Sequence, residues 1–499
     1  MSGHMDANEI LQRSSRGITL LIGRQAIIQL ITFAGGIVLA RVLNPADFGI
    51  FAIVSFIIGV LTYVGDLGVG ASLIQRKEEL TDKDLQAAFT FQLALLLLAI
   101  SFIFIVSPAI CDFYPQMPGE AIWFIRILSF SLLLASWRSI SVVQMERRLI
   151  YDRLAVIESV EALLFQATVV TLAVLGFGAW SFIWAVLLRT AAGVILAYIF
   201  APWPVGLNFN FSTIKHLLRF GVPFQYQSII NQLTSAVIPG LAGALAGPQA
   251  VGYLTWARVQ ASKPLMVVDN VARVSFPMFS RLQDDANEFL KTLTFYTTSV
   301  NLFNFFWVAL IASVGHELVV LIYGAKWINA VACLVIFSLA VPFHSLTWLV
   351  GMALNGRGQI GLVNWFITLR AVGLWSLSVF FLPKYGYVGV AAADLIINCI
   401  MAFFLLARGG PGLLKLITGS WWIALGSALA SLAGQLVKRG IYYYWGSGAI
   451  VTATVSALLA VVAVYAAAMG LMLPRSVKCT LIRICNNIIE RGRKMWQKQ

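Results

Sequence analysis

Charged residues are scarce in this chain. Asp, Glu, Lys and Arg make up only 11% of its 499 residues, whereas hydrophobic residues make up 60%. Because a water-soluble domain carries about a quarter charged residues, this composition excludes a soluble globular protein. The mean hydropathy of +0.85 and the long apolar runs indicate an integral membrane protein with helical spans, since one span needs ~20 apolar residues.

Cysteine and histidine are scarce as well. The five cysteines form no CxxC pair and the four histidines are dispersed, so the sequence contains no metal-binding pattern. The loops between the apolar runs are short and contain no nucleotide-binding motif. We therefore expect no metal, no cofactor and no catalytic residues, and we expect that the chain is not an enzyme.

Fourteen apolar runs are long enough to be membrane-spanning helices. They lie near residues 17–40, 48–74, 86–110, 121–143, 154–175, 178–200, 220–246, 249–277, 292–322, 328–353, 360–382, 387–407, 416–437 and 449–472. The sequence thus predicts an all-α, polytopic membrane protein with 14 transmembrane helices.

Lys and Arg are distributed unevenly between the two sides that these runs define. If the chain starts in the cytoplasm, 22 of them fall on the cytoplasmic side and five on the opposite side. Cytoplasmic loops of membrane proteins carry such an excess, so both termini are predicted to be cytoplasmic. The net charge of +14 then reflects topology, and we expect no nucleic-acid partner.

The sequence contains an internal repeat. Shifting the chain by 203 residues places "NPADFGIFA" (44–52) on "GPQAVGYLT" (247–255), and a shift of 209 relates residues 126–148 to 335–357 more weakly. Each half is therefore predicted to start with a long helix, to break at a proline, and to re-enter the membrane four residues later at a glycine. The pairs matched by the first shift include Pro45 and Pro248, Gly49 and Gly252, and Asp66 and Asp269.

The repeat predicts how the chain is divided. Residues 1–204 and 205–410 form two pseudo-symmetric six-helix lobes, and residues 411–473 add two C-terminal helices. Because six is an even number, the repeats are parallel, and transporters of this kind hold their substrate between the halves. Residues 474–499 form a basic cytoplasmic tail with apolar residues at helical spacing. It fits an amphipathic helix on the anionic inner leaflet or an ordinary basic juxtamembrane tail.

Several segments are similar to a known family. "LARVLNPADFGIFAIV", "DLGVGASLIQRKE", "RVSFPMFSRLQDD" and "LIYGAKW" resemble the Wzx-type polysaccharide-repeat-unit flippases of bacteria. These belong to the multidrug/oligosaccharidyl-lipid/polysaccharide exporter superfamily, and the resemblance is strongest to the colanic-acid and exopolysaccharide subgroup. It extends from about residue 10 to about residue 470.

The resemblance implies a fold and a function. The fold is two six-helix lobes forming a V, with two further helices. The function is transfer of undecaprenyl-diphosphate-linked oligosaccharide from the inner to the outer leaflet of the bacterial plasma (inner) membrane, by alternating access through a cationic central cavity. The implied partners are this substrate and membrane lipids, with a polysaccharide polymerase and a chain-length regulator as candidates.

Charged residues within the predicted spans are the candidate site. Each costs ~2.5–3.5 kcal/mol at the bilayer centre, so we expect them to face the protein interior or a wet cavity, and a basic excess suits an anionic substrate. The basic residues are Arg24, Arg126, Arg138, Arg189, Arg258, Lys263, Arg273 and Arg370, and the acidic ones are Asp66, Glu158, Glu161, Asp269 and Asp394. The predicted diphosphate-binding residues are Arg24, Arg126, Arg258 and Arg370.

The five acidic residues are predicted ion-coupling or ion-pairing groups. Asp66 and Arg24 are expected at a similar depth on adjacent helices, whereas Asp269 has Arg273 one turn away as an in-helix partner. Asp66 and Arg24 form either a structural ion pair or a functional pair. In the functional case Arg24 binds the diphosphate and Asp66 takes up a proton or a cation.

Glu158 and Glu161 share one face of a helix. They fit buried pairs with Arg189 or Arg126, and they also fit a proton-coupling pair, because neighbouring carboxylates raise each other's pKa. At a shift of 209 residues Glu161 corresponds to Arg370, so the two halves differ in charge at this position.

Three other functions are alternatives to a polysaccharide flippase. A multidrug or metabolite exporter of the same superfamily would favour an acidic, aromatic cavity, which the basic excess disfavours. A lipid II flippase has a related substrate, but the quoted motifs fit the polysaccharide subgroup better. A membrane enzyme, such as a polymerase or a ligase, would need catalytic groups on a large outer loop, and the predicted outer loops are small.

Overall fold

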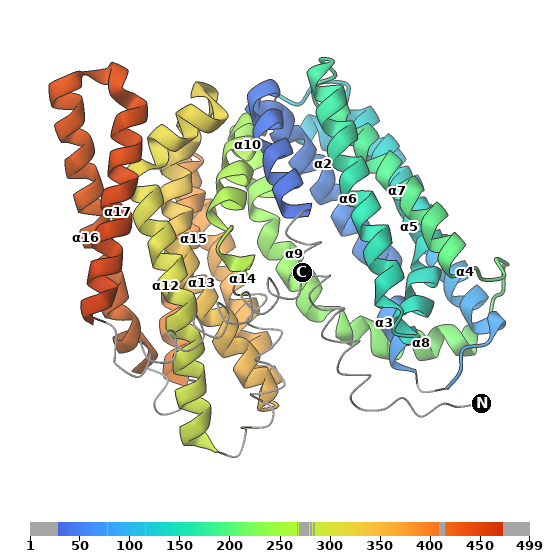
Figure 1. The fold of residues 1–499 in the computed structure, drawn as a ribbon. Coiled ribbons are helices and arrows are strands. Elements are labelled where there is room, and N and C mark those ends of the chain that lie inside the picture. Colours follow the sequence, from blue (N-terminus) through green and yellow to red (C-terminus); the bar gives the residue numbers. More distant parts are fainter. Residues whose placement is uncertain are drawn as a thin grey trace, which may run out of the picture. The chain divides into compact units, whose positions relative to one another are not determined.

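The computed structural model describes residues 28–472, except 77, 115, 267, 269–278, 280–281, 283–284 and 409–414. Every regular element among these residues is a helix (Figure 1). Twelve of the helices are long and apolar enough to cross a membrane. The prediction of an all-α, polytopic membrane protein is therefore confirmed.

The helices follow the apolar runs closely. The α-helices are α2 (Pro45–Asp66), α3 (Val69–Gln75), α4 (Asp82–Phe113), α5 (Ala121–Arg147), α6 (Tyr151–Val174), α7 (Trp180–Phe200), α8 (Phe211–Phe224), α9 (Tyr226–Ser235), α10 (Gly243–Ala261), α12 (Ala286–Leu318), α13 (Val331–Gly356), α14 (Ile360–Tyr385), α15 (Val388–Arg408), α16 (Lys415–Trp445) and α17 (Ile450–Met472). Short π or 3-10 turns are η1 (Val237–Ala242), η2 (Val319–Tyr323), η3 (Ala325–Ala330) and η4 (Ser447–Ala449). A further apolar helix, Ile28–Val42, precedes α2.

Two of the fourteen predicted spans do not appear among the twelve. The run 17–40 begins outside the described residues, and only Ile28–Val42 of that region is seen as a helix. The runs 220–246 and 249–277 appear as one apolar stretch, Tyr226–Ala261. This stretch has 36 residues, or about 54 Å of helix, which is longer than a bilayer core. The backbone breaks within it at Gly247, with φ 77° and ψ 174°, just before Pro248.

The chain forms two compact units. The first contains the described residues as far as Thr255, together with Ser378–Val390. The second contains Trp256–Leu377 and the described residues from Ala391 onward. The units follow contacts in space whereas the predicted lobes follow the sequence repeat, so the lobe boundaries at residues 204 and 410 stay a prediction. The tail 474–499 lies outside the described residues.

In the first unit, α5 packs against α4 and α7, α7 packs against α6, and α2 contacts α4 and α5. The capping of α4 is encoded locally. The N–H of Asp84 donates to the Thr81 hydroxyl over 3.2 Å, and the Thr81 N–H donates to the Asp84 carboxylate over 3.2 Å. This reciprocal arrangement satisfies two N–H groups that have no partner within the helix.

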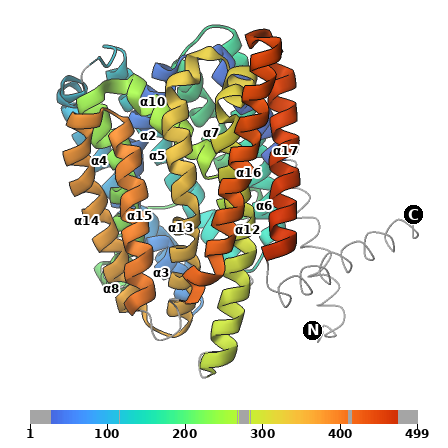
Figure 2. The same ribbon diagram turned by 90° about the vertical axis from the view of Figure 1, so that its left-hand side faces the viewer.

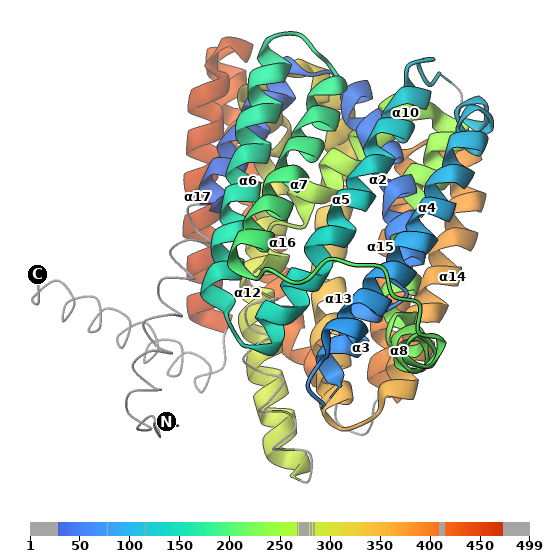
Figure 3. The ribbon, with the colours of Figure 1, turned by 90° about the vertical axis from the view of Figure 1, so that its right-hand side faces the viewer.

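Helix α8 runs crosswise to its neighbours α3 and α4 (Figures 1 and 3). Its Ile214 and Leu217 are buried, while Lys215, His216 and Arg219 between and after them are exposed. Leu217 joins an apolar cluster with residues of α3, α4 and α5. An amphipathic helix of this kind fits the membrane surface rather than a span, which explains why the hydropathy of the sequence did not predict it as a separate helix.

The predicted run 48–74 is divided in the structure. Helix α2 ends at Asp66, Leu67 and Gly68 have φ values of 42° and 76°, and α3 starts at Val69. A glycine adopts positive φ without strain, so Gly68 permits the break. Asp66 therefore stands at a helix end and not within a continuous helix.

In the second unit, α16 and α17 form an antiparallel hairpin beside α12 (Figures 1 and 2). Side chains of α16 bind backbone carbonyls of α12 at intervals along its length. Ser427 donates to the Phe305 carbonyl, Gln435 to that of Ala312 and Lys438 to that of Ser313, over 2.8, 3.0 and 2.8 Å. Lys438 also pairs with buried Glu317 at 3.1 Å. The last two spans are thus held to α12 by polar contacts as well as by apolar packing.

Candidate functional site

A buried charge cluster lies in the second unit. Arg370 of α14 and Asp394 of α15 are 9% and 8% exposed, and the Arg370 Nη2 lies 3.7 Å from the Asp394 Oδ1. The Arg370 Nε donates to the Asn398 Oδ1 over 3.1 Å, and the Asn398 amide donates to the Asp394 carbonyl over 2.7 Å. Asp394 and Asn398 are one turn apart, so they meet Arg370 from the same face of α15.

The ion pair in this cluster is loose. A separation of 3.7 Å is too long for a hydrogen bond, and the Asp394 Oδ1 accepts none from the described part of the chain. The guanidinium of Arg370 is bound by an amide oxygen and only electrostatically by the carboxylate. An anion that reached Arg370 would therefore not have to displace a charge-assisted hydrogen bond from Asp394.

Two further groups complete this cluster, which we call the Arg370 cluster. Arg258 of α10 acts electrostatically on Arg370, and His344 of α13 interacts with Asn398, Arg370 and Asp394. The Arg370 cluster thus comprises Arg258, His344, Arg370, Asp394 and Asn398. Two of its members, Arg258 and Arg370, were predicted to bind a diphosphate, and Asp394 is the one carboxylate among the five.

His344 and Asn398 were not predicted as site residues. The four histidines have no metal-ligand spacing, and a lone histidine in an apolar run carries no other pattern. The i, i+4 spacing of Asp394 and Asn398 was the one available signal, because two polar residues so placed share a helix face.

A second charge cluster lies in the first unit, across α5, α6 and α7. The Arg138 Nε lies 3.1 Å from the Glu161 Oε1, and Arg189 acts on Glu161 electrostatically. We call this group the Glu161 cluster. The carboxylate fits against Gly193 of α7, where a methyl group would lie 1.7 Å from the Glu161 Oε1. Arg189 also lies over the ring of Phe165, 5.0 Å from its centroid.

The two clusters have opposite arrangements of charge. Glu161 on α6 corresponds through the repeat to Arg370 on α14. The acidic centre of one cluster is therefore replaced by the basic centre of the other. Glu158 lies one turn before Glu161 and acts on it electrostatically. The Glu161 cluster therefore has two carboxylates for its two arginines, whereas the Arg370 cluster has one carboxylate for its two. The Arg370 cluster is the more suitable of the two for an added anion.

Arg126 has a local explanation. Pro108 within α4 lacks the N–H that would bind the carbonyl of Phe104, four residues earlier. The Arg126 Nη2 donates to that carbonyl over 2.9 Å, and its Nε donates to the Ser107 hydroxyl over 3.0 Å. The guanidinium also lies 5.3 Å from the centroid of the Phe104 ring. Arg126 therefore supplies the donor that α4 lacks at Pro108, and it lies in neither cluster.

Asp66 is surrounded by amide donors. Its Oδ1 accepts from the side chain of Gln92 over 3.0 Å, and its Oδ2 accepts from Gln225 over 2.8 Å and from the Gly68 N–H over 3.2 Å. Gln92 and Gln225 are 3% and 7% exposed. The carboxylate lies at the N-terminal end of α3, where the helix dipole favours negative charge.

Asp66 also holds the start of α9 against the end of α2. Gln225 precedes α9, and Gly221 of α8 approaches Gly68 so closely that a methyl group on Gly68 would lie 2.3 Å from the Gly221 carbonyl oxygen. The predicted pairing of Asp66 with Arg24 stays a prediction, because Arg24 lies outside the described residues. Asp269 and Arg273 lie outside them as well.

Comparison with known proteins points to one family. A family model described as "Polysaccharide biosynthesis protein" matches residues 38–332. The lipopolysaccharide biosynthesis protein WzxC of Escherichia coli (strain K12) is 24% identical over 423 residues, which cover 81% of this chain and 84% of that protein. The succinoglycan biosynthesis transport protein ExoT of Rhizobium meliloti (strain 1021) is 23% identical over 337 residues, 67% of each chain.

Two solved structures share the fold. The lipid II flippase MurJ, in an inward closed conformation, superposes with a TM-score of 0.73 at 15% identity, over 90% of this chain and 98% of that chain. An inward-facing multidrug resistance transporter of the MATE family, from the MOP superfamily, superposes with a TM-score of 0.62 at 17% identity, over 80% and 99%. The fold is therefore that of the multidrug/oligosaccharidyl-lipid/polysaccharide exporters.

Proposed function

The chain belongs to the family of polysaccharide biosynthesis proteins, in agreement with the resemblance to Wzx-type flippases, and on that premise we propose that it is itself such a flippase. Its substrate is an undecaprenyl-diphosphate-linked oligosaccharide repeat unit. The protein moves this unit from the inner to the outer leaflet of the bacterial inner membrane, where it enters surface polysaccharide synthesis. A polymerase and a chain-length regulator are its candidate partners downstream.

The observation that carries this proposal is the Arg370 cluster. The guanidinium groups of Arg258 and Arg370 share this cluster with one carboxylate, that of Asp394, inside a membrane protein, where each charge needs a partner. A diphosphate supplies the missing negative charge and accepts hydrogen bonds from a guanidinium at two oxygens. An organic cation, the typical cargo of a drug exporter, would be repelled by the same groups.

The binding step follows from the geometry of Arg370. Its Nε is held by Asn398 and its Nη2 is 3.7 Å from Asp394, so the guanidinium is oriented before a substrate arrives. Two unit charges about 4 Å apart interact by about 4 kcal/mol at an effective dielectric constant of 20. A diphosphate therefore competes effectively with Asp394, and the released carboxylate becomes free to take up a proton or a cation.

The other predicted site residues have separate roles in this proposal. Arg24 and the pairing of Asp269 with Arg273 enter this proposal only as the sequence predicts them, because all three residues lie outside the described part of the chain. Asp66 organises the junction of α2, α3 and α9 through its amide donors. Glu158 and Glu161 balance the cations of the Glu161 cluster and are the second candidate site for ion coupling.

The membrane topology that we propose has 14 spans with both termini in the cytoplasm. The two lobes rock alternately about the substrate, which gives alternating access. The apolar helices and the excess of basic residues on one side support this topology. Helix α8, with its exposed Lys215 and Arg219, lies on the cytoplasmic surface in this arrangement.

The test uses a strain deleted for this chain. Undecaprenyl-diphosphate oligosaccharides are measured in intact and everted membranes with a glycosidase that cannot cross the membrane. We expect complete repeat units on the cytoplasmic face, and their return to the outer face when the gene is restored. The variant Arg258→Gln should restore little transport, whereas the matched control Arg439→Gln, an exposed arginine on α16, should restore all of it.

Other outcomes would redirect the proposal. Normal lipid-linked oligosaccharides on the outer face, together with altered sensitivity to small toxic compounds, would indicate the multidrug or metabolite exporter instead. Full transport by Arg258→Gln at normal protein level would remove the Arg370 cluster from the binding site.

A further inference from the structure

The two copies of the repeated proline–glycine motif contact each other. Gly49 of α2 and Gly252 of α10 occupy equivalent positions 203 residues apart, as do Pro45 and Pro248. A methyl group on Gly49 would lie 1.7 Å from the Pro248 carbonyl oxygen, and one on Gly252 would lie 1.8 Å from the Pro45 carbonyl oxygen. Each glycine therefore lies against the carbonyl of the proline in the other copy.

This contact has the symmetry of the interface in a two-fold symmetric dimer. In such an interface the same patch of each partner meets the other, so that residue i contacts j and j contacts i. Here the two partners are helices of one chain within its first unit. Because the contact uses the positions at which the repeat is most similar, its pairing follows from the internal repeat.

The contact is made by backbone atoms alone. Glycine brings the two helices close enough for Cα–H groups to meet carbonyl oxygens, a weak interaction that needs no side chain. No interlocking side chains have to change rotamer when the helices separate at this point. The contact is thus tight when formed and easily parted.

Apolar side chains lie directly beneath it. One turn along α2 Ile53 is 0% exposed, and on α10 Val251 and Leu254 are both 0% exposed. The ring of Tyr114 fits against Gly243 of α10, where a methyl group would lie 2.8 Å from the Tyr114 Cε1 and 3.2 Å from the Ile53 Cδ1. These side chains form an apolar plug that excludes water while the glycines are in contact.

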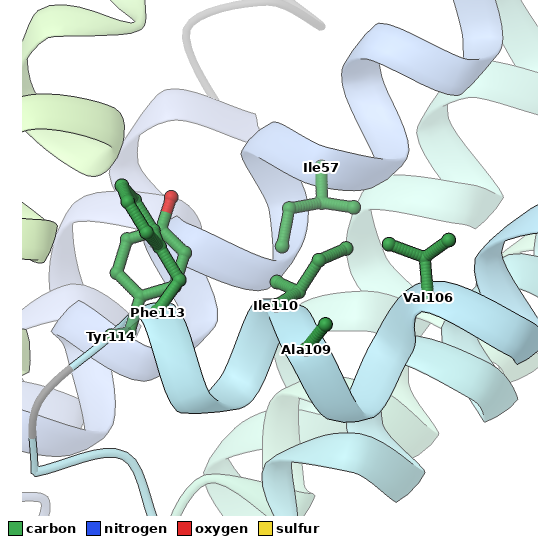
Figure 4. Close-up of a pocket in the computed structure, with 6 residues that line it drawn as sticks. All are labelled: Ile57, Val106, Ala109, Ile110, Phe113 and Tyr114. Carbon is green, nitrogen blue, oxygen red and sulfur yellow. The ribbon is translucent and has the colours of Figure 1, made fainter.

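A small cavity adjoins the plug and gives it room to move. It has a volume of about 270 Å³ and lies between α2 and the end of α4 (Figure 4). Ile57 of α2 faces Val106, Ala109 and Ile110 of α4 across it, and Tyr114 forms one wall. Side chains at the end of α4 can enter this space if α2 shifts.

We propose that the reciprocal contact of Gly49 and Gly252 is the closed gate at the outer end of the transport path. The proposal rests on the flippase function and on the topology above, in which the loops before α2 and before Pro248 face outward. Opening separates the two glycines, exposes the plug and lets the substrate leave toward the outer leaflet. Closing restores the contact through the backbone.

The test places a cysteine in the plug. In a protein whose native cysteines are replaced by alanine, Ile53→Cys reports whether the outer end is open, and Gln249→Cys, at an exposed position beside the contact, reports full access. A maleimide that cannot cross the membrane is applied to right-side-out and to inside-out vesicles. With both glycines present, we expect slow labelling of Ile53→Cys from outside and fast labelling of Gln249→Cys.

The gate is then forced apart. Gly49→Ala places a methyl group 1.7 Å from a backbone oxygen, although real contacts of this kind are not closer than 3.0 Å, so the helices must separate. We expect labelling of Ile53→Cys from outside to become faster by at least about tenfold, and Gly252→Ala to have the same effect. The matched control is Gly36→Ala in the helix before α2, where a methyl group would meet nothing within 4 Å.

Two results would overturn the gate. One is labelling of Ile53→Cys as fast as Gln249→Cys while both glycines are present, a comparison that does not depend on the folding of any glycine variant. The other is normal accumulation of Gly49→Ala with labelling no faster than in Gly36→Ala. Labelling as expected in a protein that moves no lipid-linked oligosaccharide would keep the gate and refute the flippase function, because the labelling needs no substrate.

Discussion

The Arg370 cluster allows a double substitution to separate stability from function. Asp394→Ala leaves the guanidinium of Arg370, which is 9% exposed, without its carboxylate. At the observed separation of 3.7 Å, the lost attraction is about 4.5 kcal/mol for an effective dielectric constant of 20. This agrees with the loss of about 3–5 kcal/mol found when one member of a buried pair is removed. We therefore expect Asp394→Ala to be strongly destabilised.

The double variant Arg370→Met with Asp394→Leu should behave differently. It removes both charges and fills the site with apolar groups of similar volume, and such replacements are often neutral or stabilising. The stability of parent, single and double variants is compared by thermal unfolding in detergent, read by fluorescence-detected size exclusion. A stable double variant that moves no substrate would show that the pair serves transport.

One result would refute this reasoning. If Asp394→Ala unfolds at the same temperature as the parent, Arg370 does not depend on Asp394, and Asn398 or water must compensate its charge. If the double variant is destabilised as much as the single one, the loss comes from packing and not from an unpaired charge.

Three further predictions use the same unfolding assay. Arg126→Met should destabilise the protein by about 1.5–3 kcal/mol through the loss of charged hydrogen bonds. The loss should be smaller in a Pro108→Ala background, because the new N–H of residue 108 can bind the Phe104 carbonyl. Equal losses in both backgrounds would show that Arg126 does not replace the donor that Pro108 lacks. Gly193→Ala should destabilise by about 1–3 kcal/mol through overpacking against Glu161, and an unchanged unfolding temperature would contradict the tight fit. Lys438→Met should destabilise by about 3–5 kcal/mol, because it removes the ammonium group that pairs with the buried Glu317 carboxylate of α12. A neutral effect would mean that the remaining neighbours of Glu317, His316 and Tyr442, are sufficient partners.

The fold was largely predictable because its spans are apolar and long. Of the fourteen spans predicted from hydropathy, eleven correspond each to one of the twelve membrane-capable helices in the described residues. The break after Asp66 and the crosswise helix α8 were not predicted. A backbone reversal at Leu67 and Gly68 leaves the hydropathy unchanged, and an amphipathic helix at the membrane surface has too little apolar length to register as a span.

The sequence named three of the five members of the Arg370 cluster but not their grouping. Arg258, Arg370 and Asp394 were identified because charge in an apolar run is costly. Which of them meet depends on the rotation of each helix about its axis, and one sequence does not specify this rotation. Arg126 of α5 illustrates the difficulty. Its partner is the Phe104 carbonyl of α4, which has no helical donor because Pro108 lacks an N–H. His344 was overlooked because its neighbours come from α14 and α15.

The attachment of α16 to α12 has a consequence for how this protein evolves. Ser427, Gln435 and Lys438 bind backbone carbonyls, and every residue type presents a carbonyl at these positions. Substitutions on α12 therefore leave these three bonds intact, whereas the ion pair between Lys438 and Glu317 ties the identity of a side chain on one helix to that on the other. We expect weak covariation between these two helices across relatives, even though they are in close contact. Methods that infer contacts from correlated substitutions should then underestimate this interface.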